Sequence, residues 1–323
     1  MLGLVSALVF LVHVGLGSTL FISPLRVLKE VLRGDTGGSD VLNNVVWRVR
    51  LPRALGCVLV GGLLGTVGSA FQALFRNPLA EPYIVGVSSG AAVGGALAYV
   101  LGFAGAFGGM GMMGAAFVTG LLSIALVFAM ASRRGVVQVQ TLLLAGVVVG
   151  ALLSAVLSLI LLAAGQDTNQ VLRWLLGSTT PMFWNRIAAM AVVMAVGGAV
   201  MLLQTKSLNA FAISEETAQR LGVDTSTLKS LVLVTGTAMT AAAVGSTGII
   251  GFLGLVAPHI SRRLLGVDWR WSLPGSAILG AGLLLAADIV AQRALPNTEL
   301  PVGVVTALLG APFLLVLLRR KDN

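Results

Sequence analysis

Three carboxylates in or beside long apolar runs are the side chains of this 323-residue chain best placed for chemistry inside a membrane: Glu81, Asp288 and Glu299. An ionisable residue within a membrane is a functional candidate, because burying its charge is costly. One such carboxylate could carry a proton, but a proton relay usually needs several in series, and these three do not form one. We therefore expect the energy for any uphill transport to come from another polypeptide.

The residue patterns of nucleotide hydrolysis and metal catalysis are missing from the sequence. None of the four lysines follows a glycine in a phosphate-cradling loop, so there is no P-loop. His13 and His259 lie in different apolar runs with no carboxylate four residues away, and we expect neither a metal site nor a bound cofactor. Cys57 is expected to be a small buried packing residue. The chain is therefore not predicted to be an enzyme.

The composition requires lipid as the main solvent of this chain. Hydrophobic residues make up 57% and charged residues only 10% of the sequence, and the mean hydropathy is +0.97. Soluble domains contain about 25% charged residues. No basic stripe alternates with aromatic residues, so nucleic acid is not an expected partner. We predict an all-α membrane domain over 1–323 with about ten spans: 2–22, 54–75, 84–101, 112–131, 140–164, 182–203, 230–247, 251–266, 273–291 and 301–318.

The apolar stretch 230–266 is too long for one crossing and contains several glycines where a turn is needed. We expect two spans with a turn in the region of Gly245, Gly248, Gly251 and Gly254, and a single bent span is the alternative. The end of span two, 79–82, resembles 255–258 in the seventh-to-eighth region. An odd number of spans separates the two segments, which indicates inverted internal repeats. Small residues on one side of span two predict close helix packing: Gly61, Gly62, Gly65 and Gly68.

The positive-inside rule sets the expected orientation. An even number of spans puts both termini on one side, and the basic residues 319–321 mark that side as cytoplasmic. Against this rule, the first outer segment, 23–53, is rich in Arg and Lys. These side chains either dock a partner or contact lipid headgroups.

The longest internal hydrophilic segment, 204–229, is predicted to contain a short helix over 214–221. Ser214 suits its N-cap, and Glu215 suits the positive end of the helix dipole. Gly222 suits the C-cap. The mixture of apolar and charged residues favours docking against a protein over simple connection.

Six stretches, taken together, resemble the membrane permeases of type II ABC importers for iron-siderophores, haem and vitamin B12. The resemblance covers about 20–320 and follows the family's order and spacing. The stretches are Arg50-Leu-Pro-Arg53, Arg76-Asn-Pro-Leu-Ala-Glu-Pro82, Gly86-Val-Ser-Ser-Gly-Ala91, Trp174-Leu-Leu-Gly177, Gly248-Ile-Ile-Gly-Phe-Leu-Gly-Leu-Val-Ala-Pro-His-Ile260 and Glu299-Leu-Pro-Val-Gly-Val-Val-Thr306.

The resemblance implies a multi-pass permease of a bacterial or archaeal cytoplasmic membrane with about ten spans, paired around a central path with a second copy of itself or with a closely related subunit. Two ATPase subunits, which bind the ATP and magnesium, and an extracytoplasmic substrate-binding protein complete the importer. The cargo is expected to be an iron-siderophore, with haem or vitamin B12 as alternatives. An ion-driven secondary transporter is the rival from another class.

Site residues follow from the same resemblance. Outer arginines are expected to dock the binding protein, and Gln292 stands where the family often has an arginine. The cytoplasmic loop 207–224 is expected to couple to the ATPase, with Ser214 where the family usually has glycine. Span ten and a re-entrant segment at about 170–177 are expected to line or gate the path. The predicted residues are Arg50, Arg53 and Arg293 for docking; Ser214, Glu215, Ala218, Leu221 and Gly222 for coupling; and Ser154, Ser158 and Thr306 for the path.

Overall fold

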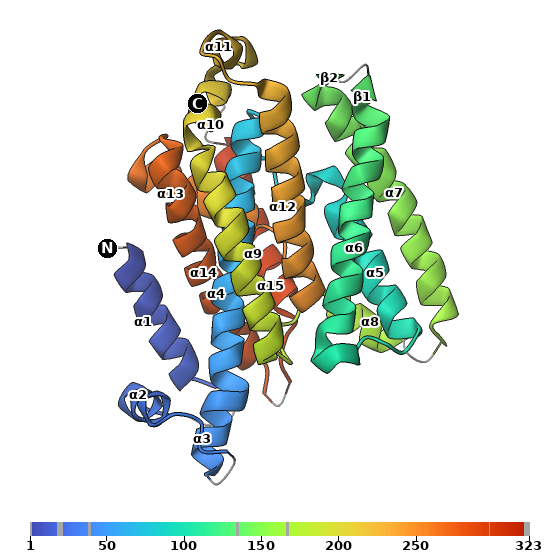
Figure 1. Ribbon diagram of the computed structural model, residues 1–323. Helices are drawn as coiled ribbons and strands as arrows, with labels where there is room; N and C mark the ends of the chain where they lie inside the picture. Colours follow the sequence, from blue (N-terminus) through green and yellow to red (C-terminus); the bar gives the residue numbers. More distant parts are fainter. Residues whose placement is uncertain are drawn as a thin grey trace.

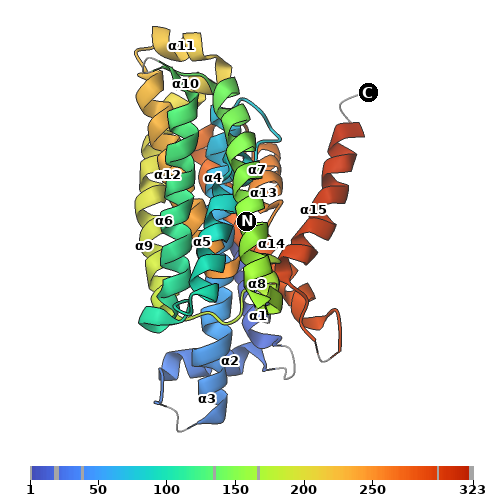
Figure 2. The same ribbon diagram turned by 90° about the vertical axis from the view of Figure 1, so that its right-hand side faces the viewer.

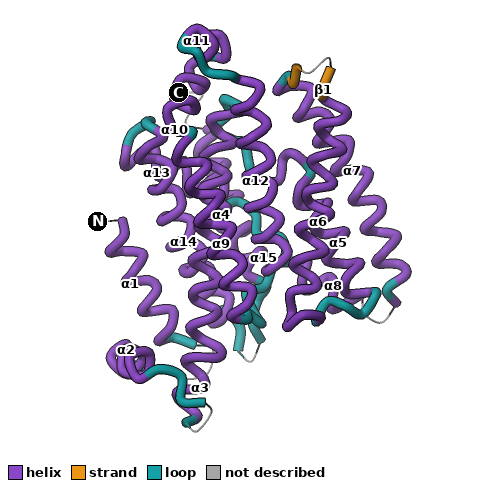
Figure 3. Tube along the Cα trace, viewed as in Figure 1, coloured by secondary structure: helices purple, strands orange, loops and turns teal. Residues whose placement is uncertain are grey.

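The computed structural model describes residues 2–17, 22–37, 40–133, 136–165, 168–296 and 298–319, and helices dominate throughout this part of the chain (Figure 3). Arg320 and Lys321, used in the expected orientation, lie outside the described residues. The helices are α1 (Leu2–Gly15), α2 (Pro24–Arg33), α3 (Val41–Val45), the π-helix η1 (Val46–Arg50), α4 (Leu51–Leu74), the 3₁₀ helix η2 (Pro82–Val85), α5 (Val87–Val100), α6 (Ala106–Ala131), α7 (Val139–Ala163), α8 (Thr168–Leu175), α9 (Trp184–Leu203), α10 (Thr205–Ile213), α11 (Glu215–Arg220), α12 (Thr225–Thr247), α13 (Leu253–Leu265), α14 (Trp269–Arg293) and α15 (Val302–Arg319).

Each of the ten predicted spans corresponds to one helix, but not every helix is long enough to cross a membrane alone. Six helical segments have sufficient length and hydropathy to span: 41–74, α6, α7, α9, α12 and α14. The other four, α1, α5, α13 and α15, are shorter or less apolar. The all-α class is therefore confirmed, with fewer full-length spans than predicted. The described strands are β1 (Ser132–Arg133) and β2 (Val136–Val137), which pair antiparallel.

Helix α4 lies at the centre of the bundle because small residues let its neighbours approach its backbone. A Cβ atom on Gly61 would lie 2.3 Å from the carbonyl oxygen of Gly280 in α14. On Gly68 it would lie 1.9 Å from the carbonyl oxygen of Gly254 in α13. Only glycine fits at such crossings, where backbone packing replaces the missing hydrophobic drive. The predicted packing face of span two is confirmed, although Gly62 has more room, with its nearest neighbour at 3.6 Å.

The expected break between the seventh and eighth spans is present, and the structure places it at Gly248. Helix α12 ends at Thr247, Gly248 adopts φ +74°, and α13 begins at Leu253. Residue Phe252 has a left-handed backbone, with φ +68°. A similar arrangement precedes α5, where Gly86, with a left-handed backbone, joins η2 to a 14-residue helix. The chain therefore contains two interrupted segments, each followed by a short helix.

The bundle has two distinct ends (Figure 1). Helix α11 and the β1–β2 hairpin lie at one end, and α2, α3 and α8 lie at the other. Helices α7 and α15 lie at the periphery, and α15 leans away from the other helices toward its C-terminal end (Figure 2). Of the most apolar stretch of α7 only 17% is buried, against 83% for the segment 41–74. The exposed faces of α7 therefore meet lipid or another protein.

Candidate functional site

A buried polar cluster surrounds Asp288 near the α2 end of the bundle. Arg53 donates to both carboxylate oxygens of Asp288, from Nε at 2.8 Å and from Nη2 at 3.0 Å. Thr179 Oγ1 donates at 2.6 Å, Gln292 Nε2 at 2.8 Å, and His13 Nε2 lies 2.7 Å away. The Asp288 side chain is fully buried. Three segments far from Asp288 in sequence, together with Gln292 of the same helix, thus satisfy one carboxylate, as a buried charge requires.

Arg53 also pairs with the second predicted carboxylate, Glu299. Its Nη1 lies 2.9 Å from Glu299 Oε2. The two partners of this arginine differ in exposure, because the Glu299 side chain is 37% exposed and that of Asp288 is 0%. One guanidinium group therefore joins α4 both to α14 and to the segment that leads into α15.

The other two predicted docking arginines hold the end of α1. Arg50 Nη1 donates to the carbonyl oxygens of Val14 at 3.0 Å and Gly15 at 2.9 Å. Arg293 lies at the same helix end, with Nη2 3.3 Å from the carbonyl oxygen of Gly17. Positive charge at a helix C-terminus is favourable, since the helix dipole is negative there.

The docking role of Arg50, Arg53 and Arg293 stays a prediction, and the structure gives these side chains partners within the chain instead. Arg50 and Arg53 are only 7% and 8% exposed, whereas Arg293 is exposed. Direct contact with a docked protein is thus open to Arg293 but not to the two buried guanidinium groups. Sequence reasoning missed the internal role, although a lone buried aspartate always requires a partner.

Potential metal ligands gather in this cluster, but their surroundings do not favour a cation. Atoms of His13, Cys57 and Asp288 lie within 4.8 Å of one another. Both carboxylate oxygens of Asp288, however, already accept hydrogen bonds from Arg53. A metal ion bound there would lie beside a guanidinium charge in a buried, poorly screened environment.

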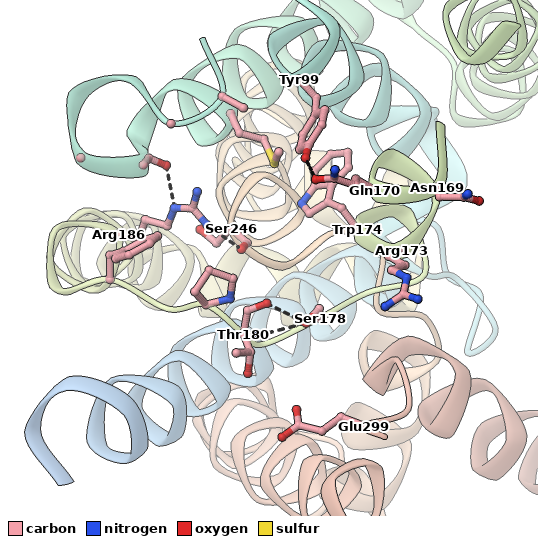
Figure 4. Close-up of a pocket in the computed structure, with 17 residues that line it drawn as sticks. Tyr99, Asn169, Gln170, Arg173, Trp174, Ser178, Thr180, Arg186, Ser246 and Glu299 are labelled. Atoms are coloured by element: carbon pink, nitrogen blue, oxygen red, sulfur yellow. Dashed lines mark hydrogen bonds between the residues drawn. The ribbon is translucent and has the colours of Figure 1, made fainter. Parts of the chain in front are cut away.

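A large cavity opens at the same end of the bundle, with a volume of about 1070 Å³. Arg173 of α8 and Arg186 of α9 lie on opposite sides of it, and Glu299 lies at its edge (Figure 4). Arg173 is exposed, whereas Arg186 donates to the carbonyl oxygen of Gly109 at 2.7 Å. Aromatic side chains complete the wall: Tyr99, Trp174 and Phe183.

The two interrupted segments meet inside the bundle. The backbone N–H of Phe252 donates to Glu81 Oε1 at 2.5 Å, next to the start of α13. The Tyr83 hydroxyl donates to the carbonyl oxygen of Ile250 at 2.8 Å and accepts from its N–H at 3.2 Å. Glu81, the third predicted carboxylate, therefore accepts from a backbone N–H that has no partner within the helix, at the start of α13. Tyr83 was not identified from the sequence, because its partner lies 167 residues away.

The predicted path residues lie on two different helices. Ser154 and Ser158 are exposed on α7, and their hydroxyl groups donate to the carbonyl oxygens of Gly150 and Ser154 in the same helix. Such bonds to the preceding turn are common for serine in apolar helices. Thr306 is 4% exposed on α15 and donates to the carbonyl oxygen of Gly303 at 3.0 Å. The structure does not bring the serines and Thr306 together within one chain.

The predicted helix at the α11 end is present over Glu215–Arg220. Ser214 Oγ accepts from the N–H of Thr217 at 2.9 Å, as expected of its N-cap. Gly222 follows the helix with φ +79°, the left-handed conformation expected of a C-cap. Leu221 is 68% exposed and Ala218 is fully buried. Leu221 is thus available to a partner, and Ala218 supports the loop from inside.

A buried ion pair ties this loop to the bundle. Lys229 Nζ of α12 lies 2.5 Å from Glu215 Oε1, and the Lys229 side chain is 5% exposed. The same ammonium group lies 5.8 Å from the centre of the Phe211 ring, within cation–π range. The position of α11 is therefore coupled to α12, the helix that ends at the Gly248 break.

Comparison with known proteins places these features in a family. The model of the FecCD transport family matches residues 4–320. The chain is 42% identical to the cobalamin import system permease protein BtuC of Halobacterium salinarum, over 88% of this chain and 76% of that protein. It is 36% identical to the hemin transport system permease protein HmuU of Yersinia pestis, over 90% and 87%.

A solved structure described as an inward-facing metal-chelate type ABC transporter is similar over 98% of this chain and 97% of that one. Its TM-score is 0.84, with 31% sequence identity. The overall fold of the chain is therefore one already seen in a transport protein. The chain belongs to the FecCD transport family.

Proposed function

We propose that residues 1–323 form one permease domain of an ATP-driven importer that moves a bulky metal chelate inward across the cytoplasmic membrane. The observation that carries this proposal is the full-length similarity to a metal-chelate type ABC transporter structure. A transport subunit rather than an enzyme also fits the sequence, which has no P-loop. ATP and magnesium would bind to a separate ATPase subunit.

The large cavity at the α2 end suits an extended anionic chelate. Arg173 supplies an exposed positive charge, and Tyr99, Trp174 and Phe183 supply flat apolar surfaces. An iron-siderophore was the expected cargo from sequence. The named relatives carry cobalamin and hemin, which supports a corrinoid or haem at least as well. The substrate class is therefore the metal chelate, with these three as members to be compared.

The two ends of the bundle would receive different partners. We assign the α11 end to the ATPase, because Leu221 is exposed there directly after a helix that the Glu215–Lys229 ion pair joins to α12. The α2 end would face the substrate-binding protein, with Arg293 as the accessible member of the predicted docking set. Both termini would then lie on the cytoplasmic side.

A second copy of this chain would complete the path. Apolar side chains of α7 and α15 are exposed, including Leu144, Val148, Leu308 and Leu309 at 50–67%. A homodimer packed on these helices would place Ser154, Ser158 and the start of α15 near its axis. Alternating access would then be a population shift between two packings, biased by ATP and by the loaded binding protein.

The rival function, ion-driven secondary transport, needs a carboxylate that is free to gain and lose a proton, whereas the three carboxylates singled out from the sequence all have partners; Glu81 accepts from the Phe252 N–H. Asp288 is buried and bound to four side chains, and Glu299 shares Arg53 with it. Carboxylates that are bound to Arg53 stay charged because the charge stabilises the fold. A proton carrier, in contrast, must bind and release a proton in each transport cycle.

Substrate choice can be tested with the permease reconstituted in vesicles with its ATPase and binding protein. Uptake of labelled cyanocobalamin, haemin and a ferric siderophore would be compared at equal concentration. Saturable, ATP-dependent uptake of one of them identifies the cargo and supports the proposal. ATP-dependent uptake of none of them, with uptake of a chelate-free solute instead, would contradict the assigned class.

A further inference from the structure

Helix α2 divides its surface into three strips. At 100° per residue, its buried face contains Val27 and Glu30, which are 3% and 6% exposed. A leucine stripe and a basic stripe run side by side along the rest of the helix. The leucine stripe consists of Leu25, Leu28 and Leu32, and the basic stripe of Arg26, Lys29 and Arg33.

The leucine stripe has no partner among the described residues, although the helix itself is firmly attached. Leu25 and Leu32 are each 79% exposed, and Leu28 is 48% exposed. On the other face, Trp47 Nε1 donates to the carbonyl oxygen of Glu30 at 3.0 Å. Asn43 Nδ2 donates to Glu30 Oε2 at 2.9 Å. Because these hydrogen bonds fix the orientation of α2, its leucine side chains are held facing away from the protein.

The position of α2 is that of a membrane interface. Trp47 stacks near Trp184, with ring centres 5.9 Å apart, and Trp184 is 43% exposed at the start of α9. Tryptophan is enriched at the level of the lipid headgroups. Helix α2 is hydrogen-bonded to this pair through Trp47 and lies at the end of the bundle, just beyond α1 (Figures 1 and 2).

The apolar surface of α1 is continuous with this region. Leu4, Leu8 and Leu11 are 77%, 63% and 40% exposed on α1. Because α1 is a peripheral helix of a membrane protein, this face meets acyl chains. The end of α1 lies close to the start of α2, because the Ile22 N–H donates to the carbonyl oxygen of Gly15 at 2.9 Å, so the leucine stripe meets the same bilayer.

We propose that α2 is an interfacial helix that binds anionic phospholipid in the leaflet at the α2 end. The leucine stripe inserts among the upper acyl chains, and Arg26 and Lys29 bind lipid phosphate groups. A leucine face beside a basic face is the pattern of helices that lie in the membrane plane. This gives a role to Arg26 and Lys29, two of the basic residues that accumulate in 23–53 against the positive-inside rule. The inference depends on the membrane location of the chain, and not on its cargo.

Arg33 is a matched control for Arg26 and Lys29, because it belongs to the same basic stripe but has acidic partners within the protein. The Arg33 guanidinium already lies 3.1 Å from Asp40 Oδ2 and 3.9 Å from Glu30 Oε2. Its charge is thus partly neutralised within the protein. Arg26→Gln and Lys29→Gln should each reduce lipid binding more than Arg33→Gln does, although all three remove one positive charge from the same helix.

The first test measures the depth of α2 in vesicles of phosphatidylglycerol and phosphatidylcholine. A nitroxide would be attached at Leu28→Cys, and at Asp35→Cys in the exposed turn after α2, in the full-length Cys57→Ser protein. We expect the label at position 28 to be more accessible to oxygen than to a water-soluble nickel complex, and the label at 35 to show the reverse. Equal nickel accessibility at both positions would overturn the proposal. So would burial of position 28 only after a binding protein is added, because the stripe would then be a protein contact.

The second test measures lipid selectivity by native mass spectrometry of the protein released from the same mixed vesicles. A basic residue near an anionic surface changes binding by about fivefold. Arg26→Gln and Lys29→Gln should each lower the enrichment of phosphatidylglycerol over phosphatidylcholine by about that factor, and Arg33→Gln by clearly less. Unchanged enrichment in the Arg26→Gln/Lys29→Gln double variant, with normal yield and thermal stability, would refute headgroup binding by α2.

Discussion

The two carboxylates bound to Arg53 should differ sharply in their contribution to stability. Asp288→Asn removes the charge that balances a buried guanidinium, since Asp288 is 0% and Arg53 10% exposed in their side chains. Breaking a buried pair from one side costs about 3–5 kcal/mol. Asparagine can still accept from Thr179 and Glu299 still faces Arg53, so we expect about 3 kcal/mol, at the low end of that range. Glu299→Gln breaks a pair whose acidic partner is 37% exposed, so it should cost about 1 kcal/mol or less.

The assay is thermal unfolding of the purified variants in one detergent. Taking about 2–4 °C per kcal/mol, Asp288→Asn should lower Tm by about 6–12 °C and Glu299→Gln by no more than about 4 °C. In a double-mutant cycle, Arg53→Met combined with Asp288→Leu should cost less than the sum of the two single changes. Equal shifts for Asp288→Asn and Glu299→Gln, or additive effects in the cycle, would refute the buried cluster as a coupled unit.

Three further predictions concern the packing, the loop and the caps. Gly68→Ala should lower Tm by overpacking against Gly254, at a cost of about 1–3 kcal/mol, whereas Gly62→Ala should be neutral or stabilising by up to about 1 kcal/mol; the reverse order in thermal unfolding would contradict the described crossing. Leu221→Asp should leave Tm within about 1 °C but reduce ATP-driven uptake, while Ala218→Arg should lower Tm as well, because only Ala218 is buried. Hydrogen bonds from Thr227 lower the pKa of Asp224, and a hydrogen bond from the Arg270 N–H lowers the pKa of Asp268. The stability that these two carboxylates add is complete above their ordinary pKa of 3.8 and is lost as the pH falls through their lower folded pKa values. On acidification below pH 3.8, the Tm of the wild type should therefore fall more than that of the Asp224→Asn/Asp268→Asn variant.

Periodicity and glycine placement allowed most of the architecture to be predicted. The break at Gly248 followed from an apolar stretch too long for one crossing, and the structure places a positive φ there. Span lengths were less predictable: the first span was expected over 2–22, and α1 ends at Gly15. Hydropathy records where a chain is apolar, but it does not show where a helix stops and the apolar chain continues as a turn.

The partners of buried charges could not be predicted, because they depend on tertiary contacts. Arg53 and Asp288 are 235 residues apart, and Arg53 and Glu299 are 246 apart. Sequence alone gave Arg53 a docking role and Asp288 a possible proton-carrying role. A carboxylate at the end of one apolar span and an arginine at the start of another were nonetheless a signal of pairing between the two.

The loop at the α11 end shows the same division between local and tertiary information. Its cap residues Ser214 and Gly222 were predictable, since they act on the adjacent backbone. Which side of the helix is free was not predictable, because the burial of Ala218 and the Glu215 pairing with Lys229 depend on α12. Of Ala218 and Leu221, both predicted to couple to the ATPase, only Leu221 has an exposed side chain, and the ATPase contact itself stays a prediction.

The most direct measurement of the central claim is uptake into vesicles that contain this permease with its ATPase and binding protein. ATP would be enclosed at the α11 end, and the chelate-loaded binding protein added at the α2 end. The account predicts uptake that requires both and that is unaffected by a pH gradient. Uptake driven by a pH gradient without ATP, and abolished by Asp288→Asn in protein that remains folded, would contradict it and establish an ion-driven transporter.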